Sequence, residues 1–123
     1  MVRKPAYKSN DCPPELRVID SISGKWTVLV VYLLSEKTIR YGQIQRLVLG
    51  ISQKVLTQTL RHLERDGIVK RKVYPVVPPQ VEYSLTPLGK TVVDHLSGLC
   101  LWAKEHYPEV KQARIQYDNR LKK

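Results

Sequence analysis

Apolar residues recur at helical spacing along most of this chain. Leu56, Leu60 and Leu63 stand four and three positions apart, so they form one stripe on a helix of 3.6 residues per turn. Ser52 precedes them, where its side-chain oxygen can accept a hydrogen bond from an exposed backbone amide. Gly67 follows them and supplies the left-handed conformation at which such helices end. The pattern predicts an amphipathic helix between Ser52 and Gly67.

Three stretches before this helix also carry apolar residues at helical spacing. A first helix opens at Pro13-Pro14, because proline is tolerated in a first turn, and ends at Ser23-Gly24. A second, at about residues 25–35, is apolar on most sides and is expected at the centre of the core. Its inward side chains are predicted to be those of Trp26, Leu29, Val30 and Leu33. A third, shorter helix is expected at about residues 41–49.

After Gly67 the pattern changes to that of a β-hairpin. Val81, Tyr83 and Leu85 alternate with polar residues as in a half-buried strand, and the two strands are expected at about residues 68–74 and 81–85. The second and third helices, the helix between Ser52 and Gly67 and the hairpin predict a mostly α (α+β) fold, a winged helix-turn-helix whose wing is the two-stranded hairpin.

Thr86-Pro87 provides the cap and first residue of a last helix, which Pro108 is expected to end. At 123 residues and 42% apolar, the chain suits one compact domain. We expect a flexible basic arm at residues 1–11, the domain with its last helix at 12–107 and a polar tail at 108–123, either partly helical or frayed. The start does not resemble a signal peptide and no apolar run could cross a bilayer, so a cytoplasmic location and no membrane partner are expected.

The positive charge of the chain is concentrated in its middle third. The net charge is +10, and residues 37–75 hold nine basic side chains against Glu64 and Asp66, which is +7 of that total. A localised basic patch indicates a polyanionic partner, because each neutralised phosphate releases condensed counterions. The cations lie across helix, turn and hairpin rather than beside a bulky apolar face, which favours nucleic acid over a membrane surface.

The face opposite the leucine stripe carries amide, hydroxyl and cationic side chains, the chemistry that reads base edges in a DNA major groove. An ordinary solvated face explains these residues equally well when the helix is taken alone, and the surrounding charge favours DNA. The reading residues expected there are Gln53, Lys54, Thr57, Gln58 and Arg61. Arg71, Lys72 and the tip at 75–80 would follow the DNA backbone or minor groove. The remaining DNA-binding residues predicted are Arg40, Ser52, Pro78, Pro79 and Gln80.

The last helix carries more apolar residues than a small domain can cover. Its stripe consists of Leu88, Val92, Leu96, Leu99 and Trp102. Exposed stripes of that size mark interfaces, and Val18 of the first helix is left over as well. We therefore expect the first and last helices to be dimerisation helices. A symmetric homodimer would match a palindromic double-stranded DNA operator. The alternative is a winged helix used as a protein-interaction module without operator binding.

Several short motifs lie in a familiar order between residues 12 and 102. They are Cys12-Pro13, Ile22-Ser23-Gly24-Lys25-Trp26, Gly50-Ile51-Ser52, Leu56-Thr57, Leu60-Arg61-x-Leu63-Glu64-x-Asp66-Gly67 and Tyr74-Pro75-x-Val77-Pro78-Pro79-x-Val81-Glu82-Tyr83-Ser84-Leu85-Thr86-x-x-Gly89. Together they resemble the signature of the HxlR-type bacterial transcription regulators. Ser23 and Tyr41 depart from it, where the family usually has Gly and Phe. The resemblance implies a homodimeric DNA-binding activator or repressor without enzymatic activity.

The two cysteines do not form a disulfide framework. Cys12 stands just before a helix start, which favours the thiolate, while Asp11 opposes it. Cysteines at this position are redox or electrophile sensors in some members of the family that this chain resembles, which makes Cys12 a candidate sensor for an oxidant or small-molecule effector. A small buried residue is the equal alternative. For Cys100, packing within the last helix is expected.

The remaining chemistry-bearing residues do not form a catalytic or metal site. Ser23-Gly24-Lys25 lacks the first glycine and the Ser/Thr of a phosphate-binding loop, so a helix break is expected there. The histidines have no partner at metal-ligand spacing with either cysteine; they are His62, His95 and His106. His62 lies on the basic helix and is expected at the surface or near a phosphate. No enzymatic activity, cofactor or metal is expected.

Overall fold

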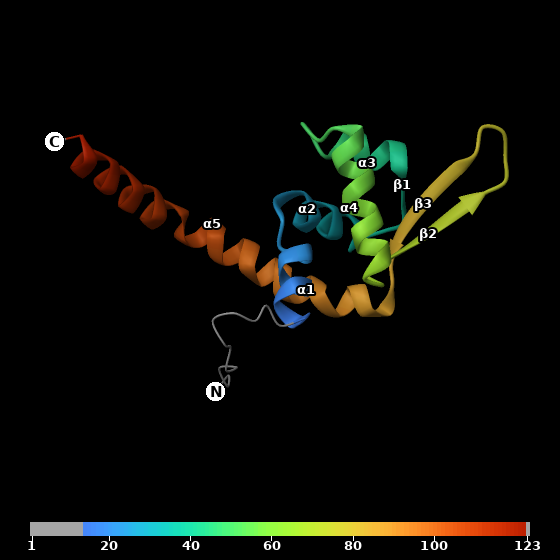
Figure 1. Cartoon of the computed structure of the whole chain (residues 1–123), viewed down its shortest axis with the longest axis horizontal. Coiled ribbons are helices and arrows are strands. Elements are labelled where there is room, and N and C mark those ends of the chain that lie inside the picture. Colours follow the sequence, from blue (N-terminus) through green and yellow to red (C-terminus); the bar gives the residue numbers. More distant parts are fainter. Residues whose placement is uncertain (1–13, 123) are drawn as a thin grey trace.

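The computed structural model describes residues 14–122. The elements follow in the order α1 (Pro14–Ile22), α2 (Lys25–Leu34), β1 (Ile39–Arg40), α3 (Tyr41–Leu47), α4 (Gln53–Arg65), β2 (Val69–Tyr74), β3 (Gln80–Leu85) and α5 (Pro87–Leu121). The hairpin of β2 and β3 projects at one end of the molecule, and α5 extends away at the other (Figure 1). This arrangement confirms the predicted mostly α fold with a winged helix-turn-helix.

The sheet has three antiparallel strands in the order β1-β3-β2. Its register pairs Ile39 with Tyr83 and Val69 with Leu85. The sequence did not predict β1, because two residues are too few to show an alternation. This short strand pairs with β3 and leads directly into α3, so it connects the wing to the helices.

The predicted ends and stripe of α4 are confirmed. The Ser52 hydroxyl accepts a hydrogen bond from the backbone amide of Val55 at 3.1 Å. Gly67 has φ +75°, the left-handed conformation that stops a helix without a side-chain clash. The three leucines of the stripe are buried in the core. Each local signal in this segment thus agrees with the packing of the whole fold.

The centre of the core is formed by α2 and α4 with the sheet. Val30, Val31 and Leu34 of α2 are buried, as predicted for Val30. The prediction that Leu29 points inward is wrong, since 42% of its surface is exposed, and Trp26 and Leu33 are only partly buried. A helix that is apolar on most sides does not reveal which face packs, and the packing of α4 and α5 on α2 decides it here.

Pro108 does not end the last helix, contrary to the prediction. The helix α5 is 35 residues long and contains Pro108 in its interior. Proline removes one backbone hydrogen bond and crowds the preceding turn. The regular turns on both sides continue in spite of that loss. Residues 108–121, which were expected to be a polar tail, are therefore helical. No helix within residues 14–122 has the length and hydropathy needed to span a membrane.

Candidate nucleic-acid interface

The outer face of α4 carries the side chains that the sequence singled out. Gln53, Lys54, Gln58 and Arg61 are exposed, opposite the buried leucines, and Thr57 is half-buried at the edge of that face. Arg65, one turn beyond Arg61, is also exposed there and was not among the predicted residues. Its spacing of four from Arg61 was the signal that could have identified it. We name these six residues the reading face.

The helix α3 contacts the edge of the reading face. The Tyr41 hydroxyl donates a hydrogen bond to the backbone carbonyl of Gln53 at 3.2 Å and lies 2.8 Å from Oγ1 of Thr57. Ser52, also a predicted DNA-binding residue, uses its hydroxyl oxygen to cap α4. These contacts fix the start of α4 relative to α3. The Tyr41 contacts leave no sign in the sequence, because they join residues 12 and 16 positions apart.

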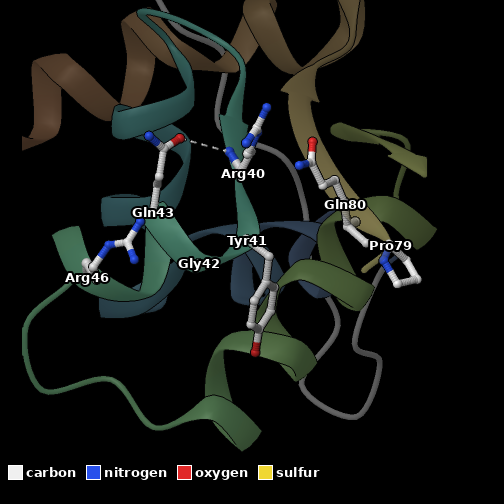
Figure 2. A pocket seen from close by; sticks show the side chains of 8 residues that line it. Arg40, Tyr41, Gly42, Gln43, Arg46, Pro79 and Gln80 are labelled. Atoms are coloured by element: carbon white, nitrogen blue, oxygen red, sulfur yellow. Dashed lines mark hydrogen bonds between the residues drawn. The ribbon is translucent and has the colours of Figure 1, made fainter. Parts of the chain in front are cut away.

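An open cleft of about 400 Å³ lies between α3 and the start of β3. Gln43 and Arg46 lie on its α3 side, and Pro79 and Gln80 on its wing side (Figure 2). Gln43 accepts a hydrogen bond from the backbone amide of Arg40 at 3.4 Å, which holds the first turn of α3. Arg46 is exposed and lines this cleft, although the sequence pattern marked it only as part of the basic segment. The cleft thus presents a second cationic surface beside the reading face.

One carboxylate organises the middle of the wing. Glu82 accepts a hydrogen bond from the Tyr74 hydroxyl at 2.9 Å, and its other oxygen lies 3.9 Å from Nε of Arg40. Lys72 stands opposite Glu82 in the register, with its ammonium 4.9 Å from the centre of the Tyr74 ring. The wing therefore holds Arg40 and Lys72 at its surface while one acid offsets part of their charge.

The exposed surface of the wing combines cations with an apolar tip. Arg71, Lys72, Pro78 and Pro79 are exposed, and Gln80 is half-buried. Val77 next to them is fully exposed. On the inner face, burial raises the pKa of the Tyr83 hydroxyl above its ordinary value, although the nearby guanidinium of Arg71 lowers it in part. Tyr83 is therefore neutral at physiological pH and serves as a core residue.

The predicted interface residues separate into two groups. Leu88, Leu99 and Trp102 are exposed by more than half of their surface, at 55%, 56% and 54%. Leu96, with 9% exposed, belongs to the core of this chain, and Val92 packs partly buried against that core. The expectation that all five form one exposed stripe is corrected for these two, because α5 turns that side toward α2. Further exposed apolar residues on α1 and α5 are Val18, Ile19, Tyr107, Ile115, Tyr117 and Leu121.

The remaining candidate residues are the thiols and the histidines. Cys12, the candidate sensor, lies outside the described residues. Cys100 is exposed, so the prediction that it is packed is wrong. His62 is exposed beside a polar cleft between α1 and α4, which agrees with both alternatives predicted for it. Within residues 14–122 no three potential metal ligands gather at one place.

The fold, with a polar and cationic outer face on α4, is that of a helix-turn-helix protein. The sequence profile of the HxlR-like helix-turn-helix family matches residues 21–111, and this chain belongs to that family. It is similar to YtfH of Escherichia coli (strain K12), an uncharacterized HTH-type transcriptional regulator, with 43% identity over 101 residues, 82% of this chain and 80% of YtfH. The members of this family are transcriptional regulators and not enzymes.

Two solved structures show the same fold. The transcriptional regulator YtfH from Salmonella typhimurium superposes with a TM-score of 0.77 at 42% identity, covering 82% of this chain and 90% of that one. The redox regulator HypR in its reduced form superposes with a TM-score of 0.75 at 36% identity, covering 81% and 99%. In both cases the likeness extends over most of each chain.

Proposed function

We propose that this protein regulates transcription by binding double-stranded DNA sequence-specifically as a homodimer. The observation that carries the proposal is the division of α4 into a buried leucine stripe and a polar, cationic reading face. The basic segment of net charge +7 surrounds that face, and a polyanion is the partner that such a charge attracts. A helix of this kind enters a major groove with its polar side chains toward the base edges.

The residues divide into two roles. Gln53, Gln58 and Arg61 have amide and guanidinium groups that can bond two base atoms at once, so they are assigned to base reading. The cationic groups outside the helix are assigned to phosphate contacts, which position the protein without reading sequence. These phosphate-contacting residues are Arg40, Arg71 and Lys72, and the structure adds Arg46 as a candidate. Pro78, Pro79 and Gln80 would lie along the DNA at the tip of the wing.

A second copy is proposed to pack against α1 and α5. Leu99 and Trp102 of α5, with Val18 and Ile19 of α1, offer an exposed apolar surface that one chain leaves uncovered. A twofold dimer would present two reading faces to one side of DNA and would match a palindromic operator. The boundaries proposed for the regulatory domain remain residues 12–107, with the far half of α5 continuing beyond it.

Cys12 is proposed as the sensor of an oxidant or electrophile. Its position before the first helix and the redox regulator HypR among the similar structures support this proposal. The test uses a variant with Cys100→Ser, so that Cys12 is the remaining thiol. A thiol pKa well below ~8.5 and altered DNA affinity after mild oxidant are expected. An ordinary thiol pKa with unchanged DNA affinity would make Cys12 a structural residue.

A salt titration of duplex binding tests DNA recognition itself. With genomic fragments as probes, the logarithm of the affinity should fall linearly with the logarithm of salt concentration. Fragments that retain binding at higher salt should share a palindromic sequence, and mapping them would identify the operator. No detectable duplex binding at low salt would contradict the proposal and leave a protein-interaction module as the function of the winged helix.

A further inference from the structure

Tyr41 joins α3 to two successive turns of α4. Its hydroxyl donates to the backbone carbonyl of Gln53 at 3.2 Å and lies 2.8 Å from Oγ1 of Thr57. The Tyr41 side chain extends from the start of α3 toward α4 (Figure 2). Gln53 and Thr57 are four positions apart, so the tyrosine bridges one turn of α4 at the edge of the reading face.

The protons of these hydroxyl groups determine what Thr57 can offer to DNA. A tyrosine hydroxyl has one proton, and the Gln53 carbonyl can only accept. With that proton on Gln53, the threonine hydroxyl is the donor in its contact with Tyr41 and uses its own single proton inside the protein. With the roles reversed, the Thr57 oxygen accepts from Tyr41, so in both arrangements the hydroxyl of Thr57 is held against Tyr41.

The other branch of the Thr57 side chain is a methyl group. The two branches occupy staggered positions on Cβ, so a hydroxyl held against Tyr41 also fixes the direction of the methyl group. Thr57 stands one turn from both Gln53 and Arg61, within the reading face. A methyl group in a major groove has an apolar counterpart, the C5-methyl group of thymine.

We propose that Thr57 reads thymine through its methyl group and that Tyr41 is the positioning residue that fixes this orientation. The inference rests on the proposed DNA binding and adds a specificity to it. In this arrangement the hydroxyl of Thr57 contacts Tyr41 and its methyl group contacts the DNA. Without Tyr41, a threonine on a reading helix would be free to bond a base through its hydroxyl.

The test removes single methyl groups from the DNA. A sequence is first selected by the wild-type protein from random duplexes, and each thymine in it is then replaced by deoxyuridine. At one thymine per half-site, wild-type affinity should fall about fourfold, the factor that corresponds to one methyl-sized group of buried apolar surface. Thr57→Val has a methyl group on both branches and one preferred rotamer in a helix, so it should retain this thymine-to-uracil ratio without the contact to Tyr41. Thr57→Ser should bind both duplexes equally.

Tyr41→Phe tests the positioning role. This change removes one oxygen and leaves the ring, so the ratio at the same thymine should fall toward one because Thr57 is free to rotate. Two matched variants should leave the ratio unchanged: Thr59→Ser, half-buried on the other side of α4, and Tyr74→Phe, whose hydroxyl bonds Glu82. Each ratio is taken within one variant, so a general loss of affinity cancels.

The outcomes separate this inference from the proposal on which it rests. A wild-type protein that selects no sequence would contradict sequence-specific binding, and with it this reading. A selected sequence in which every thymine tolerates uracil would overturn the methyl contact alone. A uracil effect that persists in Thr57→Ser would assign the contact to another residue, and one that persists in Tyr41→Phe would overturn the positioning role of Tyr41.

Discussion

The helices α4 and α5 begin in the same way and differ in what they bury. Each is capped by a hydroxyl: Ser52 accepts from the amide of Val55, and Thr86 accepts from the amide of Gly89. Within the 13 residues of α4, one face is buried and the other is polar. Within the 35 residues of α5, the buried ones are Gly89 and Leu96, and large apolar side chains remain exposed along its length.

The difference indicates two ways in which a helix gains stability. Tertiary packing of an apolar face stabilises α4, as in most short helices of globular proteins. In α5 the first turns pack on α2 and the sheet, and the far half continues away from the domain (Figure 1). A helix of about 50 Å, at 1.5 Å per residue, exceeds the width of this small domain. A partner for its far half is therefore expected in the proposed dimer.

Leu60→Ala should produce the largest loss of stability. Leu60 is 1% exposed, and removing a buried leucine side chain leaves a cavity that costs about 2–5 kcal/mol. Leu99→Ala on α5 should cost less than about 1 kcal/mol in the monomer, because the side chain is exposed there. Urea denaturation at several protein concentrations measures both.

The concentration dependence distinguishes core from interface. Leu99→Ala should remove mainly the part of the stability that rises with protein concentration, as expected for a residue between two copies. Leu60→Ala should lower stability at every concentration. Equal losses for the two variants, independent of concentration, would show that Leu99 contributes to the domain itself.

Two glycines of α5 should respond in opposite directions to alanine. A Cβ at Gly89 would overlap the backbone oxygen of Ile68, so Gly89→Ala must displace the start of α5 and should cost about 1–3 kcal/mol. At Gly98, an added Cβ meets no described residue outside its own helix backbone within 4 Å. Gly98→Ala should stabilise by about 0.5–1 kcal/mol, since alanine loses less entropy in a helix. A thermal melt of both variants against wild type checks this, and a loss at Gly98 would indicate a partner at that surface.

Arg61 and Lys72 should separate base reading from phosphate binding. If Arg61 contacts a base edge, Arg61→Ala should weaken operator binding by about 1–3 kcal/mol and relax the preference at one position of each half-site. Lys72→Ala should weaken all sequences alike and reduce the salt slope by about one. Competition between the operator and unrelated duplexes measures the two effects. Equal, sequence-independent losses of affinity would show that Arg61 does not read a base and that the reading face lies elsewhere. Both variants should fold as the wild type does.

The sequence predicted those parts of the fold that local rules determine. The cap at Ser52, the stop at Gly67 and the leucine stripe are all within one segment, so α4 was predicted nearly to the residue. Whether Leu29 and Leu96 are buried depends on which elements pack on α2, and helical spacing alone does not contain that information. The far end of α5 was missed because one proline was given more weight than the helical residues on both sides of it.

The candidate site was predictable in its chemistry and less so in its geometry. Net charge and helical phase are sufficient to identify the polar face of α4. The links between Tyr41 and Thr57, and between Glu82, Arg40 and Tyr74, join residues from different elements and leave no pattern in the sequence. These links matter for function because they decide which polar groups remain free to meet DNA.

The two helix caps should differ in strength, although their geometry is alike. Ser52→Ala removes an exposed acceptor and should cost about 1 kcal/mol. Thr86 is half-buried, and its hydroxyl also contacts the Ile68 carbonyl at 3.2 Å, so Thr86→Ala should cost about 2 kcal/mol, the upper end for caps. Ser52→Asn and Thr86→Ser keep a side-chain acceptor and should recover most of each loss. Urea midpoints of the four variants measure the difference. If Ser52→Ala proved the costlier change, the start of α4 would contribute more to folding than the docking of α5 on the sheet.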